Sequence, residues 1–83
     1  MIYDFQIRTL EKYLETLGFK IVAKSQVTNN VFILAERENK DAPQEVTATA
    51  LNMQLPSKLI ATIESVIASK QSTTITVRIM EVQ

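Results

Sequence analysis

The sequence predicts one small α+β domain, a two-layer sandwich in which both helices cover one face of a four-stranded, mostly antiparallel sheet. The expected element order is α-β-β-β-α-β. Three observations predict it: an apolar stripe with helical spacing over residues 3–17, an alternation with a period of two from Phe19 onward, and a second helical stripe after Pro56. Because 83 residues leave room for a single core, the domain is expected to span residues 1–83.

The first helix is predicted over residues 3–17. Its apolar side chains recur every four or three residues, namely Tyr3, Ile7, Leu10, Leu14 and Leu17. Asp4 is a suitable residue to cap the start of this helix. Gly18 is expected to end it in the left-handed conformation, and Phe19 to fold back against its last turn.

A β-hairpin is predicted over residues 19–37, and its loop has two or three residues around Asn29 and Asn30. A two-residue loop would pair Ala23 with Glu36 and turn carboxylates toward the core. A three-residue loop, residues 28–30, pairs Ala23 with Ala35 and avoids that cost, so it is the register we predict.

This register has a consequence for the apolar run of residues 31–35. Phe32 and Leu34 are expected on the side away from the helices, with Val22 nearby. Arg37 is expected to turn inward at the strand end, where its long side chain can still reach water. The strand is therefore apolar on both sides, although a hairpin strand usually has one polar side.

The second half of the chain is predicted as loop, strand, helix and strand. Residues 38–44 form the polar loop, and residues 45–53 alternate Val46, Ala48 and Ala50 against Thr47, Thr49 and Leu51. Pro56 is expected to open a helix with the stripe Leu59, Ile60, Ile63, Val66 and Ile67. Residues 73–82 form the last strand, and no internal repeat is visible.

Composition excludes several kinds of chemistry. The chain has no cysteine and no histidine, which excludes thiolate and imidazole metal sites, cysteine nucleophiles and Ser-His triads. A magnesium or calcium ion held by carboxylates stays possible, but the charged run of residues 36–41 is interpreted as a solvated strand end. No cofactor or metal is expected. No apolar stretch is long enough for a membrane span and Asp4 comes too early for a signal peptide, so a cytoplasmic protein is expected.

The predicted element order resembles the core of the PD-(D/E)XK nucleases. That resemblance implies an acid on the second strand and an acid-x-lysine on the third, which hold magnesium and orient water. Here Glu36 and Glu38 stand at the end of the second strand, while residues 46–50 contain neither an acid nor a lysine. A degenerate nuclease fold without catalytic residues is therefore one alternative.

The first five predicted elements also resemble a double-stranded RNA-binding domain, and Ser57-Lys58-Leu59 is similar to the start of that family's second helix. The resemblance implies contact with phosphates through basic side chains. A nucleic-acid-binding domain is thus a second alternative, with Lys20, Lys24, Arg37 and Lys58 as its candidate residues. Nine basic and nine acidic residues give no net charge, so nucleic acid is not the expected partner.

The expected function is a small non-enzymatic interaction or regulatory domain that acts through its apolar sheet face, as a homodimer or with another protein. Its size and plain chemistry fit an accessory protein of bacterial or phage type. The predicted interface residues are Val22, Phe32, Leu34, Thr49, Leu51, Thr76, Arg78 and Met80. The last strand is a further suspect, because Arg78 is its one basic residue and an unprotected edge invites pairing with a second chain.

Overall fold

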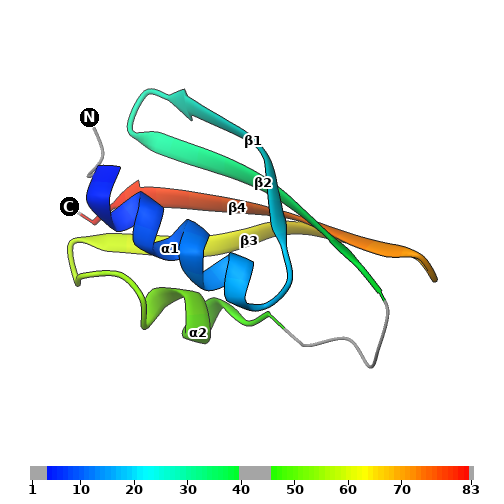
Figure 1. The fold of residues 1–83 in the computed structure, drawn as a ribbon. Coiled ribbons are helices and arrows are strands. Elements are labelled where there is room, and N and C mark those ends of the chain that lie inside the picture. The colour runs from blue at the N-terminus through cyan, green and yellow to red at the C-terminus, as the bar shows by residue number, and fades with distance from the viewer. Residues whose placement is uncertain (1–3, 40–45, 83) are drawn as a thin grey trace.

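The computed structural model describes residues 4–39 and 46–82 (Figure 1). In this part of the chain the elements are α1 (Asp4–Thr16), β1 (Lys20–Val27), β2 (Asn30–Glu38), α2 (Ala48–Asn52), β3 (Leu59–Ala68) and β4 (Ser72–Glu81). The strands form one antiparallel sheet in the order β1-β2-β4-β3, and the helices pack on it. The predicted α+β class and the four-stranded antiparallel sheet are confirmed.

The predicted order of the elements is wrong in its second half, because the observed order is α-β-β-α-β-β. Residues 45–53 were expected to form a strand, yet the described part of this segment contains α2. Thr47 caps that helix, since its hydroxyl oxygen accepts a hydrogen bond from the backbone N–H of Ala50 at 3.1 Å. Both family resemblances depended on the predicted order, so neither is supported by the fold.

The helix that Pro56 was expected to open is absent from the described residues, and the residues of its predicted stripe belong to β3 instead. The register of β3 against β4 shifts between Ile63 and Ser65, which marks a β-bulge at Glu64. An extra residue moves the following side chains to the other face of the sheet. The apolar residues of β3 therefore recur at spacings that imitate a helical stripe, which is the physical reason for the error.

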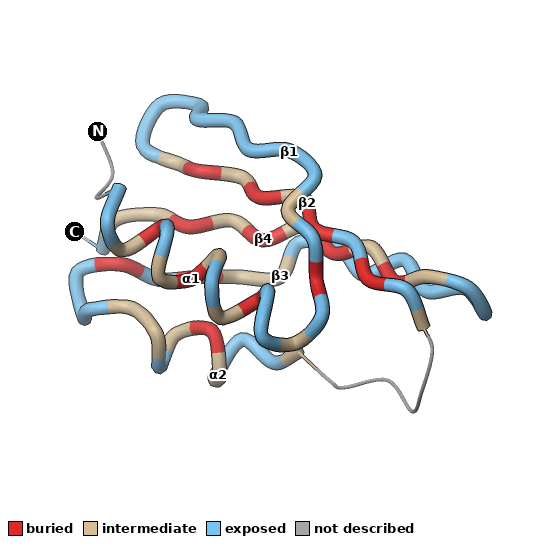
Figure 2. Tube along the Cα trace, viewed as in Figure 1, coloured by how far each residue is buried: buried red, intermediate tan, exposed pale blue. Residues whose placement is uncertain are grey.

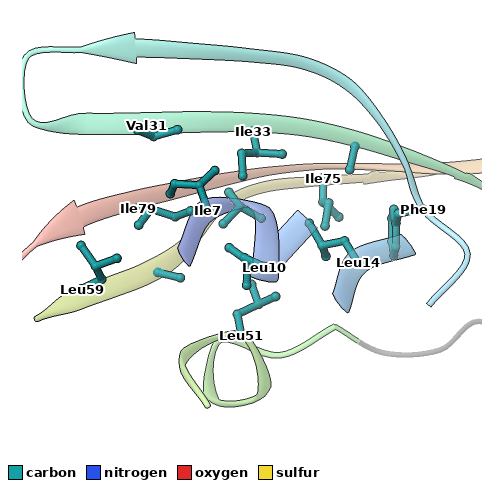
Figure 3. Close-up of a cluster of buried hydrophobic side chains, with 13 residues drawn as sticks. Ile7, Leu10, Leu14, Phe19, Val31, Ile33, Leu51, Leu59, Ile75 and Ile79 are labelled. Carbon is teal, nitrogen blue, oxygen red and sulfur yellow. The ribbon is translucent and has the colours of Figure 1, made fainter. Parts of the chain in front are cut away.

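The core lies between the sheet and the two helices (Figure 3). Along β4 every second residue from Thr73 to Ile79 is buried, and Ile75 and Ile79 of this set lie next to α1 (Figure 3). The cluster of buried apolar side chains consists of Ile7, Leu10, Leu14, Phe19, Val31, Ile33, Ala35, Leu51, Leu59, Ala61, Ile75, Val77 and Ile79. The Tyr3 end of the predicted helical stripe and most of the predicted 38–44 loop lie outside the described residues.

The end of α1 is as predicted. Gly18 has a φ of 92°, the backbone N–H of Phe19 donates to the carbonyl of Leu14 at 3.0 Å, and that of Gly18 donates to Glu15 at 3.0 Å. This pair of bonds is a Schellman motif, which brings Phe19 back onto the last turn. Arg37 points to the helix side as predicted, and its guanidinium carbon lies 5.0 Å from the centre of the Phe19 ring.

The predicted hairpin register is wrong by one residue. The loop has two residues, Thr28 and Asn29, so Ala23 pairs with Leu34 instead of Ala35. A bulge at Val22 then shifts the register, and Ile21 takes the position opposite Ala35. The prediction assumed that the pairing of β1 with β2 is uninterrupted. The bulge in β1 inserts one extra residue, so the pairing near the loop and the pairing beyond the bulge differ by one residue.

Thr28 adopts a φ of 54°, which is unfavourable for a β-branched residue. Replacing Thr28 with Gly should therefore raise the free energy of unfolding, by about 0.5–1 kcal/mol after the greater flexibility of glycine in the unfolded chain is subtracted. Urea denaturation measures this difference. The control is Asn29→Gly, because Asn29 has no positive φ and the same flexibility is added without relief of strain. A Thr28→Gly variant that is less stable than the native protein would contradict the prediction.

The two halves of the fold repeat one αββ unit. The two-residue turns at Thr28–Asn29 and Lys70–Gln71 are 42 positions apart, and so are the bulges at Val22 and Glu64. β2 and β4 are the central strands of the sheet, while β1 and β3 are its edges. The expectation that the last strand forms an edge is therefore wrong, because β4 is paired on both sides.

Candidate interaction surface

The face of the sheet that points away from the helices carries an apolar patch. Register places Met80 between Asn30 and Ile60, Phe32 beside Arg78, and Leu34 beside Thr76. We define the outer-face patch as Val27, Phe32, Leu34, Ile60 and Met80. Val27 and Ile60 are 55% and 40% exposed, and the other three are partly buried. Among the described residues, no helix or loop lies over this face, since both helices pack on the other side (Figures 1 and 2).

The structure brings five of the eight predicted interface residues together on this face. They are Phe32, Leu34, Thr76, Arg78 and Met80, which belong to the adjacent strands β2 and β4. Val22 is exposed at the bulge of β1. The expected positions of Thr49 and Leu51 are wrong, because both belong to α2, and Leu51 is fully buried in the core.

The middle of the outer face is polar, and four of its polar side chains lie in two pairs. Nε of Arg78 lies 2.6 Å from Oε1 of Glu64, and the hydroxyl of Ser65 donates to Oγ1 of Thr76 at 3.1 Å. The charges therefore neutralise each other locally. The apolar character is concentrated toward the end of the sheet that holds the β1–β2 turn.

The acidic residues that the structure describes do not assemble a metal site. Within residues 4–39 and 46–82, no three Asp or Glu side chains lie close enough together to hold an ion. Lys40 and Asp41, part of the charged run at the end of β2, lie outside the described residues. The segment that the nuclease resemblance needs as a third strand contains α2 instead.

The four candidate nucleic-acid residues are scattered over the molecule. Lys20 is exposed at the start of one edge strand, whereas Lys58 precedes the opposite edge strand. Nζ of Lys24 lies 3.5 Å from Oε2 of Glu11, and Arg37 is buried beneath the end of α1. Binding to a polyanion depends on several basic groups on one surface. These four do not form one.

Sequence reasoning missed the exposed part of β3. Val66 and Ile67 were assigned to the buried stripe of a helix, but they are 59% and 68% exposed in the structure. The signal that favours a strand was present in the composition, because half of the residues in 59–68 are β-branched: Ile60, Thr62, Ile63, Val66 and Ile67.

Comparisons of the chain with protein-family models, with curated proteins and with solved structures found no match. Neither helix in the described part of the chain has the length and apolar character needed to cross a membrane.

Proposed function

We propose that the protein is a non-enzymatic, cytoplasmic interaction domain that works as a homodimer and binds a protein partner through the outer-face patch. The observation that carries the proposal is the uncovered apolar surface around Phe32 and Leu34. These side chains are partly buried by their neighbours on the sheet, and nothing among the described residues covers the rest.

Apolar surface left in water is costly for a domain as small as this one. Full burial of a Phe or Leu side chain contributes about 1.5–3 kcal/mol, and part of that is lost where the side chain is only partly buried, as Phe32 and Leu34 are. A domain has a total stability of about 5–15 kcal/mol, so apolar surface left in water is a substantial cost. A protein partner that covers the patch recovers this free energy as binding energy.

The surroundings of the patch suit a protein partner. A polar, internally paired region borders it, where Arg78 and Glu64 form their ion pair. Protein interfaces combine an apolar centre with a polar rim, and charged residues with satisfied partners belong to the rim. The outer face has this composition over β2 and β4.

A photo-crosslinking residue at position 32 tests the proposal in the cells that naturally produce the protein. We expect a covalent adduct of defined mass from position 32. The control carries the same residue at position 53, since Met53 is 79% exposed on the helix side of the sheet. An adduct with a mass other than twice the 9.4 kDa chain mass identifies a partner protein, whereas an adduct of twice that mass would place a second copy on the patch and contradict the proposed partner. If position 32 yields no more adduct than position 53, the proposal is wrong.

A further inference from the structure

The free edge of β3 is closed in its first half by the chain itself. The backbone N–H of Leu59 donates to the carbonyl of Pro56 at 3.0 Å. The side-chain amide of Asn52 bridges the next position, since it donates to the carbonyl of Ala61 at 2.9 Å and accepts from the N–H of Ala61 at 2.8 Å. An external strand cannot use these groups.

Among the described residues, no strand or loop pairs with the second half of the same edge. Ser69 donates its backbone N–H to Ser72 at 2.8 Å across the hairpin, and backbone direction alternates along a strand. The N–H and C=O groups of Val66 and Ala68 therefore point away from β4. No hydrogen bond from a described residue reaches them on that side. We call residues Ile63–Ala68 the open β3 edge.

The repeat within the fold provides an internal comparison for this edge. Positions 66, 67 and 68 of β3 correspond to positions 24, 25 and 26 of β1, because the two turns and bulges are 42 residues apart. β1 carries Lys24, Ser25 and Gln26 there, whereas β3 carries Val66, Ile67 and Ala68. Charged and polar residues on an edge strand prevent pairing with other chains. One edge of this sheet has that protection and the open β3 edge does not.

We propose that the open β3 edge pairs in antiparallel orientation with the same edge of a second copy, which joins the two sheets into one of eight strands. This inference rests on the homodimer clause of the proposed function and names the contact that forms the dimer. A two-fold axis makes such an interface self-complementary. Main-chain hydrogen bonds supply affinity, as in other cases of strand addition.

The register of the pairing follows from the direction of the backbone groups and from charge. Val66 and Ala68 must face partners whose groups also point outward, which allows a two-fold axis at Val66, at Ile67 or at Ala68. With the axis at Ile67, Val66 lies opposite Ala68 of the second copy. This arrangement brings Glu64, which also lies against Arg78 of its own copy, near Lys70 of the second copy. Centring the pairing on Val66 would place Glu64 opposite an alanine, and centring it on Ala68 would place Lys70 opposite a valine. The charge complementarity favours a second copy as occupant, with Ile67 at the axis.

The arrangement also links the edge to the outer-face patch. Neighbouring strands in one sheet keep the same face on the same side, so the helices of both copies lie on one side and both patches lie on the other. Ile67 of each copy meets its counterpart on the patch side. The dimer therefore presents two partner sites on one continuous surface.

Disulfide formation by an Ile67→Cys variant tests the position of the axis. The native chain has no cysteine, so a protein–protein disulfide can form only between the introduced thiols of two copies, where one thiol displaces glutathione from its mixed disulfide with the other. Residues opposite each other at a non-hydrogen-bonded position have Cα atoms about 4.5 Å apart, which suits a disulfide. With oxidised glutathione we expect most of the protein to become a linked dimer on a non-reducing gel. The matched control is Ser25→Cys at the equivalent position of β1, and it should stay a single chain.

A Val66→Lys variant tests the edge without a covalent bond, because it copies the residue that β1 carries at the equivalent position. Analytical ultracentrifugation should show twice the chain mass for the native protein and one chain mass, 9.4 kDa, for this variant. The far-UV circular dichroism of a folded α+β domain should be retained. The double variant Phe32→Lys with Leu34→Lys should remain a dimer, since the outer-face patch is not the contact between copies.

The failures of the two proposals are distinguishable. A native dimer that Val66→Lys does not dissociate, or an Ile67→Cys variant that links no better than Ser25→Cys, overturns edge pairing and leaves the proposed function intact. A native protein that stays monomeric at millimolar concentration overturns both edge pairing and the homodimer clause. Linked dimers through position 67 without any adduct at position 32 support edge pairing and overturn the proposed role of the outer-face patch.

Discussion

Replacing Leu51 with Lys should abolish folding, whereas Thr49→Lys, two residues earlier in the same helix, should change the free energy of unfolding by less than about 0.5 kcal/mol. Leu51 is fully buried and connects α2 to the core, while Thr49 is exposed. Loss of a buried leucine alone costs about 2–5 kcal/mol, and an unpaired buried ammonium group adds several more. That sum approaches the whole stability of a domain of this size. Circular dichroism of the two variants during urea denaturation measures the difference.

The pair of variants also separates the observed fold from the predicted one. In a strand over residues 45–53, Thr49 and Leu51 would lie on the same face, and both would be exposed. Lysine would then have similar, small effects at the two positions. Equal effects would therefore contradict the structure. A Leu51→Ala variant keeps the comparison quantitative, because a partial loss of about 2–5 kcal/mol can be measured where the lysine variant does not fold.

The elements of the first half of the fold, though not the register of its hairpin, could be predicted because their signals are local. The stripe that includes Ile7, Leu10 and Leu14 has an uninterrupted helical spacing, and these residues are buried. Gly18 ends the helix through the one backbone conformation in which glycine is favoured. The inward turn of Arg37 followed from alternation along β2, which has no bulge.

The second half could not be predicted because two local signals were misleading. Residues 47–51 alternate as a strand would. However, Thr47 caps a helix, and Leu51 is buried in the core. In β3 the bulge at Glu64 breaks the alternation, so a pattern with a period of two was hidden. Tertiary packing decided both segments.

Part of the outer-face patch could be predicted, because alternation along a strand is a local signal. Alternation along residues 31–35 and 73–82 placed Phe32, Leu34 and Met80 on one face without knowledge of which strands are neighbours. Ile60 was missed, because it belongs to the strand that was read as a helix. The open β3 edge was missed entirely, since an edge depends on strand order, and strand order depends on pairing between residues distant in sequence.

Replacing Asn52 with Ala should lower the free energy of unfolding by about 2 kcal/mol. The side chain of Asn52 takes the place of a neighbouring strand for Ala61, with hydrogen bonds of 2.8 and 2.9 Å to its N–H and C=O groups, and it also donates to the carbonyl of Ala48 at 2.8 Å. The bonds to Ala61 are partly buried, and leaving a buried backbone group without a partner costs about 1–3 kcal/mol. Urea denaturation measures the loss, and Asn29→Ala in the exposed β1–β2 turn is the control.

An Asn52→Asp variant separates the two bonds to Ala61. It has the same shape and keeps an oxygen to accept from the N–H of Ala61, but it places a carboxylate oxygen against the carbonyl of Ala61. Amide hydrogen exchange at Ala61 should therefore be faster in Asn52→Ala than in the native protein. In Asn52→Asp it should be slower than in Asn52→Ala. Both variants should be less stable than the native protein. The amide of Leu59, which is bonded to Pro56, serves as the internal reference. Unchanged exchange at Ala61 in Asn52→Ala would contradict the role of Asn52. Faster exchange of the Ala61 amide in Asn52→Ala would mean that the side chain of Asn52 closes the first half of the β3 edge. Strand addition would then be confined to Ile63–Ala68.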